Sequence, residues 1–73
     1  MSKTNENLKR LGAFIREKRI EKGMSLMTLA ELACVSWQNI WKIEAGKYNP
    51  SWDYLCSIIL ALGYTVVFEP IEE

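Results

Sequence analysis

Two serines in the middle of the chain constrain its fold most, because each stands directly before a short segment with apolar residues at helical spacing. Ser25 precedes residues 26–33, and Ser36 precedes residues 37–44. A serine at such a position can accept a hydrogen bond from a backbone N–H of the first helical turn, so it commonly starts a helix. Gly46 follows the second segment, and glycine commonly ends a helix. The sequence therefore predicts two short helices joined by a tight turn.

Longer apolar patterns on both sides supply the packing partners that two short helices need. Residues 7–22 carry an apolar stripe at helical spacing that includes Ile15. Ser51 precedes residues 52–62, which present a broad apolar face. We therefore expect an all-α fold, a compact domain of four helices that spans residues 7–63.

The last apolar segment has a different period and predicts a short β-strand. Its β-branched and aromatic residues, stopped by Pro70, are Tyr64, Thr65, Val66, Val67 and Phe68. A lone strand leaves backbone groups unpaired on both of its edges. Pairing with the same strand of a second copy, antiparallel about a two-fold axis, would satisfy those groups. We therefore expect residues 64–69 to be a dimerisation strand, the alternative being an extended tail packed on its own helices.

The two ends of the chain complete the predicted organisation, with a flexible N-terminal arm at residues 1–6 and an acidic tail at residues 70–73. The formal net charge is zero, which argues mildly against a nucleic-acid partner, although the distribution of charge decides where DNA could bind. Beyond Lys22 the basic residues are Lys42 and Lys47. Any contact with DNA phosphates near the two short helices would therefore involve few basic side chains.

The composition also argues against metal, membrane and catalytic classes. The chain has no histidine, and Cys34 and Cys56 lie in apolar stretches, so we expect buried, reduced thiols, the alternative being a disulfide between them. We expect neither a metal nor a cofactor. No segment approaches about 18 apolar residues, and the first residues lack the apolar part of a secretion signal. We expect a soluble, cytoplasmic protein without membrane contact. Without histidine or paired carboxylates in a pocket, it is not expected to be an enzyme.

Two short helices with a tight turn between them form the helix-turn-helix pattern, which favours binding to double-stranded DNA. Ala30 is small enough to let the two helices approach, and Val35 and Ile40 fill the angle between them. Further residues on both sides of this pattern also follow a known order along the chain. In sequence, the pieces are Leu11-Gly12, Ile15, Arg19, Gly23-Met24-Ser25, Leu29-Ala30, Val35-Ser36, Ile40, Ile43-Glu44-Ala45-Gly46-Lys47, Asn49-Pro50-Ser51 and Ala61-Leu62-Gly63. With these pieces the chain resembles, from Leu11 to Gly63, the phage-repressor/Cro-like family, known as the XRE family.

This resemblance implies a lambda-repressor-like fold, with five helices in the usual count. It also implies a structural ion pair between Arg19 and Glu44 that ties the first helix to the end of the third. The chain departs from the family at Leu26, where a glutamine usually braces a DNA phosphate. Since leucine cannot make that contact, phosphate binding at this point would depend on helix N-terminal amides and on Ser25.

Residues of the 37–44 helix that face away from Ile40 and Ile43 are the expected readers of DNA. The expected base contacts are Trp37, Gln38, Asn39 and Lys42, because amide side chains suit adenine and a lysine suits guanine. The expected phosphate contacts are Ser25, Trp41, Lys47, Tyr48, Asn49 and Ser51.

The sequence thus predicts a sequence-specific transcriptional regulator that binds a palindromic operator as a homodimer, with repression as the expected mode. One alternative is the antitoxin of a toxin–antitoxin pair, with a toxin protein as a further partner, because residues 64–69 resemble the paired strands of HipB-type antitoxins. The other is a helix-turn-helix scaffold used only for protein association. That second alternative is favoured by the zero net charge, Leu26 and the tryptophans Trp37, Trp41 and Trp52.

Overall fold

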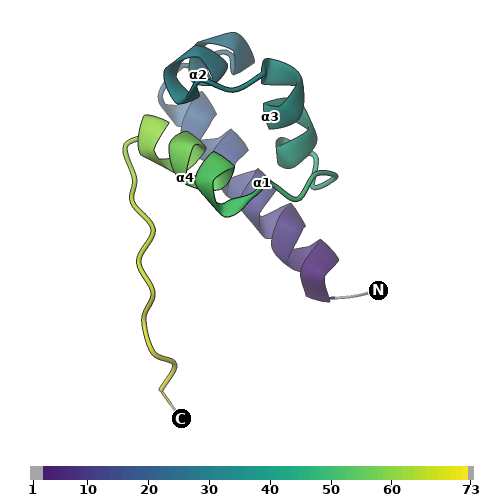
Figure 1. Ribbon diagram of the computed structural model, residues 1–73, viewed down its shortest axis with the longest axis vertical. Coiled ribbons are helices and arrows are strands. Elements are labelled where there is room, and N and C mark those ends of the chain that lie inside the picture. Colours follow the sequence, from purple (N-terminus) through teal and green to yellow (C-terminus); the bar gives the residue numbers. More distant parts are fainter. Residues whose placement is uncertain (1–2, 73) are drawn as a thin grey trace.

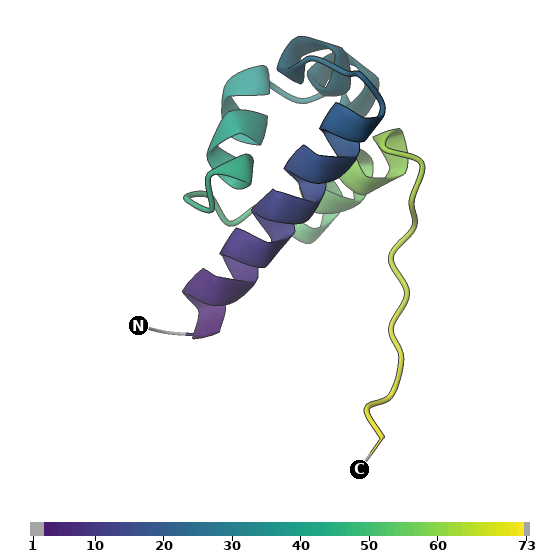
Figure 2. The same ribbon diagram turned by 180° about the vertical axis from the view of Figure 1, so that it is seen from behind.

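Four α-helices make up the computed structural model, which describes residues 3–72, with side chains from Glu6 onwards. The helices are α1 (Lys3–Glu21), α2 (Leu26–Ala33), α3 (Trp37–Glu44) and α4 (Trp52–Ala61). The long α1 runs behind the three shorter helices in Figure 1 and in front of them in Figure 2. It packs against α3, while α2 packs against both α3 and α4. The expected all-α fold is confirmed, with four helices among the described residues rather than five.

Serine caps start the three short helices, as predicted. The side chains of Ser25, Ser36 and Ser51 accept hydrogen bonds from the backbone N–H three residues further on, at 3.0, 3.2 and 3.3 Å respectively. Each cap satisfies one N–H that has no partner within its own helix, which typically stabilises a helix by about 1 kcal/mol. The bounds of α2 and α3 agree with the prediction, and α4 ends one residue before the predicted Leu62.

The core lies where all four helices meet. Its fully buried large side chains are Ile15, Leu29, Ile40, Ile43, Ile58 and Leu62. Full burial of one such aliphatic side chain contributes roughly 1.5–3 kcal/mol. Helix α3 supplies two of these buried side chains, Ile40 and Ile43, from the same side. Their packing fixes the orientation of α3 on the domain, and the opposite side of the helix faces outward.

A close approach between α1 and α3 requires a glycine. A Cβ at Gly12 would lie 2.7 Å from the carbonyl oxygen of Glu44 and would also collide with the carbonyl oxygen of Ile43. Both of these are backbone atoms, which cannot move aside as the end of a side chain can. Gly12 therefore lets the middle of α1 touch the C-terminal end of α3.

The N-terminal end of the chain differs from the prediction. Helix α1 begins at Lys3, so residues 3–6 of the expected flexible arm are helical, while residues 1 and 2 lie outside the described part. Glu6 in the first turn favours the longer helix, because a carboxylate near unpaired helical N–H groups is stabilising.

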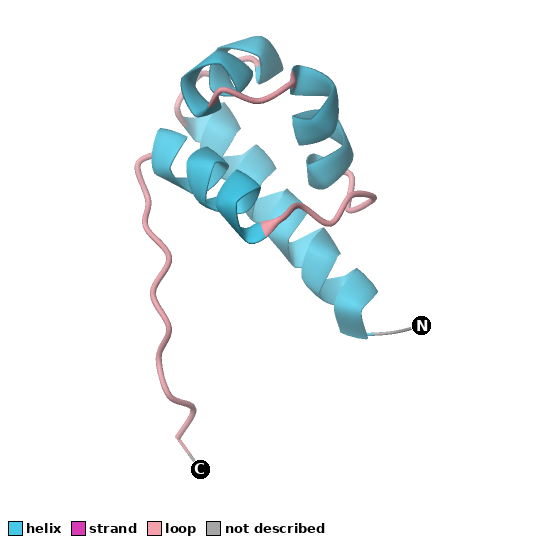
Figure 3. Ribbon diagram, viewed as in Figure 1, coloured by secondary structure: helices cyan, strands magenta, loops and turns pink. Residues whose placement is uncertain are grey.

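The C-terminal segment is an extended tail and contains no strand within the described residues 64–72 (Figure 3). Tyr64 donates its backbone N–H to the carbonyl oxygen of Ile59 at 3.0 Å, and no further backbone–backbone hydrogen bond is formed from residue 65 to residue 72. The predicted strand is therefore absent from a single copy, because a strand needs a neighbour and the described helices offer none.

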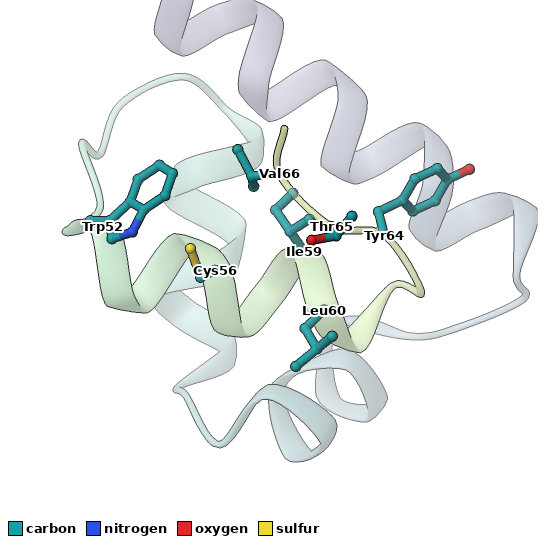
Figure 4. A pocket seen from close by; sticks show the side chains of 7 residues that line it. All are labelled: Trp52, Cys56, Ile59, Leu60, Tyr64, Thr65 and Val66. Atoms are coloured by element: carbon teal, nitrogen blue, oxygen red, sulfur yellow. The ribbon is translucent and has the colours of Figure 1, made fainter. Parts of the chain in front are cut away.

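Aromatic contacts hold parts of this tail against the helices. The Tyr64 ring meets Phe14 edge-on, with 5.4 Å between ring centroids, and the Phe68 ring stacks on Trp52 at 5.7 Å. Between these two contacts, α4 and the tail enclose a shallow apolar hollow (Figure 4), which is lined by Trp52, Cys56, Ile59, Leu60, Tyr64, Thr65 and Val66. The tail thus has a defined course along α4.

The cysteines are free thiols, but they are less buried than the sequence suggests. Cys34 is exposed and Cys56 is half-buried. Cys34 follows α2 with φ 59°, a left-handed conformation that turns the chain towards α3 and leaves the side chain in solvent. Among the described residues, none of the helices combines the length and the apolar character needed to cross a membrane.

Candidate nucleic-acid interface

Helix α3 has a polar and aromatic side that faces away from the core. Since successive helical residues are about 100° apart, the direction opposite Ile40 and Ile43 is centred near Gln38, with Trp41 and Lys42 within about 50° on either side. All three side chains are exposed. Trp37 is 41% exposed and Trp41 is 53% exposed, so neither ring is folded into the core. The structure therefore brings Gln38, Trp41 and Lys42 together on one helix face, with the exposed Trp37 at its edge, about 90° from the centre.

Asn39 differs from these four residues. It lies about 110° from the centre of the outward face of α3 and is half-buried. Its amide Nδ2 donates a hydrogen bond to the hydroxyl of Tyr54 in α4 at 2.9 Å. One donor of the amide is therefore engaged within the protein.

The start of α2 carries the predicted phosphate contact Ser25. Its Oγ accepts from the backbone N–H of Thr28 and also lies 3.0 Å from the Thr28 hydroxyl, and both residues are exposed. Leu26 packs against the core, which explains how this position tolerates an apolar residue. The unpaired N–H groups at this helix end, together with two hydroxyls, form a local anion-binding arrangement.

The loop between α3 and α4 carries the remaining predicted phosphate contacts. Lys47, Asn49 and Ser51 are exposed, whereas Tyr48 is half-buried. The ring of Tyr48 packs against the core and meets Tyr54 edge-on, with 6.2 Å between centroids. This loop therefore presents one cation and several hydrogen-bonding groups beside the C-terminal end of α3.

The ion pair implied by the resemblance is present. Arg19 Nε lies 2.7 Å from Glu44 Oε2, and Arg19 Nη2 lies 3.1 Å from Glu44 Oε1. Arg19 Nη1 also donates to the carbonyl oxygen of Met24 at 2.9 Å. The hydrogen bond with Glu44 raises the pKa of Arg19 above its ordinary value, against a smaller opposing effect of burial. This pair fixes the end of α3 to α1 and leaves neither side chain free for DNA.

Two of these contacts were missed by the sequence prediction. Tyr54 lies in the segment 52–62 that the sequence predicts to be an apolar helix, yet its hydroxyl accepts a hydrogen bond from Asn39. Thr28 is not among the predicted contacts, yet its hydroxyl lies within hydrogen-bond distance of the Ser25 hydroxyl. The contact of Thr28 could have been predicted, because its hydroxyl stands three residues after a helix-capping serine. No local sequence pattern relates Asn39 to Tyr54.

The described residues contain no cluster of three or more histidine, cysteine, aspartate or glutamate side chains that could hold a metal ion. The polar groups on this face are amides, hydroxyls and ammonium groups. Such groups are hydrogen-bond donors suited to phosphate oxygens and base edges. The outward side of α3 and the adjoining loop are therefore chemically suited to bind a nucleic acid, with its phosphates and base edges.

The sequence matches a family of known domains and one curated protein. Residues 10–67 match the family described as "Helix-turn-helix domain". A protein of Aeropyrum pernix, whose name assigns it to the HTH-type transcriptional regulatory proteins, is 38% identical over 58 residues. The match covers 80% of this chain and 17% of that protein, so this chain spans less than a fifth of the relative's length.

Two crystal structures are similar in fold. The clp gene regulator ClgR from Corynebacterium glutamicum gives a TM-score of 0.75 at 36% identity, covering 80% of this chain and 62% of ClgR. The restriction-modification controller protein C.AhdI from Aeromonas hydrophila gives a TM-score of 0.78 at 30% identity, covering 81% of this chain and 89% of C.AhdI. These names describe regulators rather than enzymes, as the sequence predicted.

Proposed function

The chain belongs to the helix-turn-helix family of transcriptional regulators, and on that premise we propose that it binds double-stranded DNA sequence-specifically through α3. The main support is the outward side of α3, which exposes the amide of Gln38, the ammonium of Lys42 and two tryptophan rings. The opposite side of the helix is buried in the core. A helix of this kind fits the major groove, where base edges differ in their donors and acceptors.

Roles follow from position on that face. Gln38 lies at its centre and reads an adenine through its amide, while Lys42 reads a guanine edge. Trp37, at the N-terminal end of the helix, packs on a thymine methyl group or a sugar. Around the helix, the phosphate backbone is held by Ser25, Trp41, Lys47, Tyr48, Asn49 and Ser51, and by the N-terminal amides of α2 and α4.

The regulator acts as a homodimer whose two copies pair their tails antiparallel, from Tyr64 to Phe68. Support comes from the unpaired backbone of residues 65–72 and from the exposed apolar side chains on it, with Val67 68% exposed and Phe68 81% exposed. In Figures 1 and 2 the tail and α3 lie on opposite sides of the domain. Tail pairing can therefore leave α3 free to contact DNA.

A two-fold dimer of this kind binds a palindromic operator, because each copy reads one half-site. Occupation of such an operator near a promoter would block transcription, so we propose repression as the mode. A single α3 contacts too few base pairs for useful selectivity, and the second copy doubles the number that are read.

Selection from a pool of randomised duplexes tests the proposal directly. The wild-type protein is expected to enrich a site with two inverted half-sites. Gln38→Ala should relax the preference at one base pair of each half-site, by about 1–3 kcal/mol of discrimination. Lys42→Ala should likewise relax the preference at one base pair. Its charge-matched control is Lys22→Ala, just beyond the end of α1, which should leave the preferred site unchanged. Failure of the wild type to enrich any sequence at low salt would contradict the proposal.

The exposed rings of Trp37 and Trp41 favour one competing function, a scaffold for protein association. Large exposed aromatic side chains are common at protein interfaces. The selection separates the two functions, because a scaffold would enrich no DNA sequence. In that case Trp37→Ala and Trp41→Ala would weaken capture of a protein partner instead.

A further inference from the structure

A single hydrogen bond joins the first turns of α3 and α4. Asn39 and Tyr54 stand at equivalent positions, each three residues after a capping serine whose side chain accepts its backbone N–H. The side chains of these two residues then meet, with Asn39 Nδ2 donating to the Tyr54 hydroxyl at 2.9 Å. The N-terminal turns of two capped helices are thus tied to each other directly.

Tyr54 is well placed to hold this bond. It is half-buried, packs against the core, and lies edge-on to the ring of Tyr48 with 6.2 Å between centroids. Its ring therefore has little freedom to swing, and the position of its hydroxyl is set by packing. A fixed acceptor of this kind restrains both the amide of Asn39 and the turn of α3 that carries it.

We propose that Asn39 and Tyr54 are a positioning pair for DNA recognition, which sets the angle of the reading helix α3 against the phosphate-facing start of α4. This inference rests on the proposed function. It gives Asn39 a different role from that of a base reader, in keeping with its half-buried place at the border of the outward face. Gln38 and Lys42 read the bases, and the pair keeps their helix in register with the phosphate contacts near Ser51.

Tyr54→Phe is the variant that tests the pair, because it removes the hydroxyl and keeps the ring and its packing. Two affinities are measured at low temperature, after circular dichroism has shown each protein to be fully folded. One is for the duplex that the wild type selects from a random pool, and the other is for a duplex of unrelated sequence. A purely structural bond would change neither affinity in a fully folded protein.

The ratio of the two affinities is expected to fall about fivefold in Tyr54→Phe, which is the change expected for one ordinary hydrogen bond. Affinity for the unrelated duplex and the salt dependence should stay as in the wild type. Asn39→Ala should lower the ratio equally, and the double variant should lower it no further. Ser57→Ala is the control, since its hydroxyl on α4 binds only the carbonyl oxygen of Asp53, and it should change nothing.

Two results would overturn the positioning pair. One is an unchanged ratio in fully folded Tyr54→Phe. The other is a loss of preference at one base pair in Asn39→Ala that Tyr54→Phe does not share, which would make Asn39 a direct reader. If the wild type selects no sequence at all, the proposed function itself has failed, so the two failures are distinguishable.

Discussion

Arg19 and Glu44 are joined by two nearly parallel hydrogen bonds, of 2.7 and 3.1 Å, between residues 25 positions apart in the sequence. Their side chains are 11% and 5% exposed. Because Glu44 is the last residue of α3, the pair fixes the C-terminal end of the proposed reading helix to α1. A third bond, from Arg19 to the carbonyl oxygen of Met24, extends the link to the chain just before α2.

Loss of Glu44 should destabilise the domain strongly, because it leaves the largely buried guanidinium of Arg19 without a carboxylate partner. Loss of Arg19 leaves Glu44 with the more distant Arg16, whose Nη1 lies 4.0 Å from Glu44 Oε1. We expect Glu44→Ala to lower the free energy of unfolding by about 3 kcal/mol. In the double variant Arg19→Ala/Glu44→Ala, the free energy of unfolding should fall by less than the sum of the decreases in the two single variants. Urea unfolding followed by circular dichroism measures these values. Glu17→Ala, on the exposed side of α1, should stay within about 0.5 kcal/mol of the wild type, and a similarly small loss in Glu44→Ala would contradict the role of the pair.

The stabilisation by Arg19 should not vary with pH near neutrality. Its pKa, already far above neutrality for a free arginine, is raised further by the hydrogen bond with Glu44. A group whose pKa is raised on folding contributes its full stability below the unfolded value, and loses it only as pH rises through the higher folded value. The stability difference between the wild type and Arg19→Ala should therefore be constant from about pH 7 to pH 9. A difference that shrinks within this range would contradict the assignment.

Gly12→Ala should be destabilising, although alanine is normally the better helix former by about 1 kcal/mol. The added Cβ would collide with the backbone carbonyls of Ile43 and Glu44, so α1 and α3 would have to move apart. We expect a loss of about 2–3 kcal/mol, typical of overpacking against groups that cannot yield. The adjacent exposed Ala13 is the matched site, where Ala13→Gly should cost only about 1 kcal/mol. Equal or greater stability of Gly12→Ala would show that the approach of the two helices is not tight.

Local signals in the sequence predict the helices well and the contacts between them poorly. Ser25, Ser36 and Ser51 mark helix starts because a cap acts over three residues. The Asn39–Tyr54 bond depends on how α3 and α4 are placed, which no local pattern contains. Residues 64–69 have a strand-like composition but form an extended tail, because a strand needs a neighbouring strand and one copy of the chain offers none.

Binding of DNA should show a modest dependence on salt, because Lys42 and Lys47 are the cations on α3 and in the loop that follows it. We expect about 3–5 phosphate contacts per subunit, at about 0.9 each in the slope of log affinity against log salt concentration. Lys47→Ala should reduce the slope by about 1 per subunit and weaken binding to all sequences alike. Lys22→Ala, remote from α3 in sequence, is the charge-matched control. A slope above about ten for the dimer would mean that more of the surface contacts DNA than the α3 face and its flanking loops.

The tail offers the sharpest test of the dimer. Val67→Asp places a charge on the exposed part of the tail, where an antiparallel partner would bury it. The dissociation constant of the dimer should rise at least about 30-fold, which is the effect of losing one strong interface residue. The helical content should be unchanged. Analytical ultracentrifugation measures the dissociation.

Ile20→Asp is the matched control for Val67→Asp, because it makes the same kind of change at another exposed apolar residue, on α1. It should leave the dimer intact. In the proposed dimer, the monomeric Val67→Asp variant would also lose most of its affinity for the full palindrome but keep its affinity for a single half-site. If Val67→Asp remains dimeric, the two copies do not meet through residues 64–68. If the wild type is monomeric even on the palindrome, the proposed dimer is wrong.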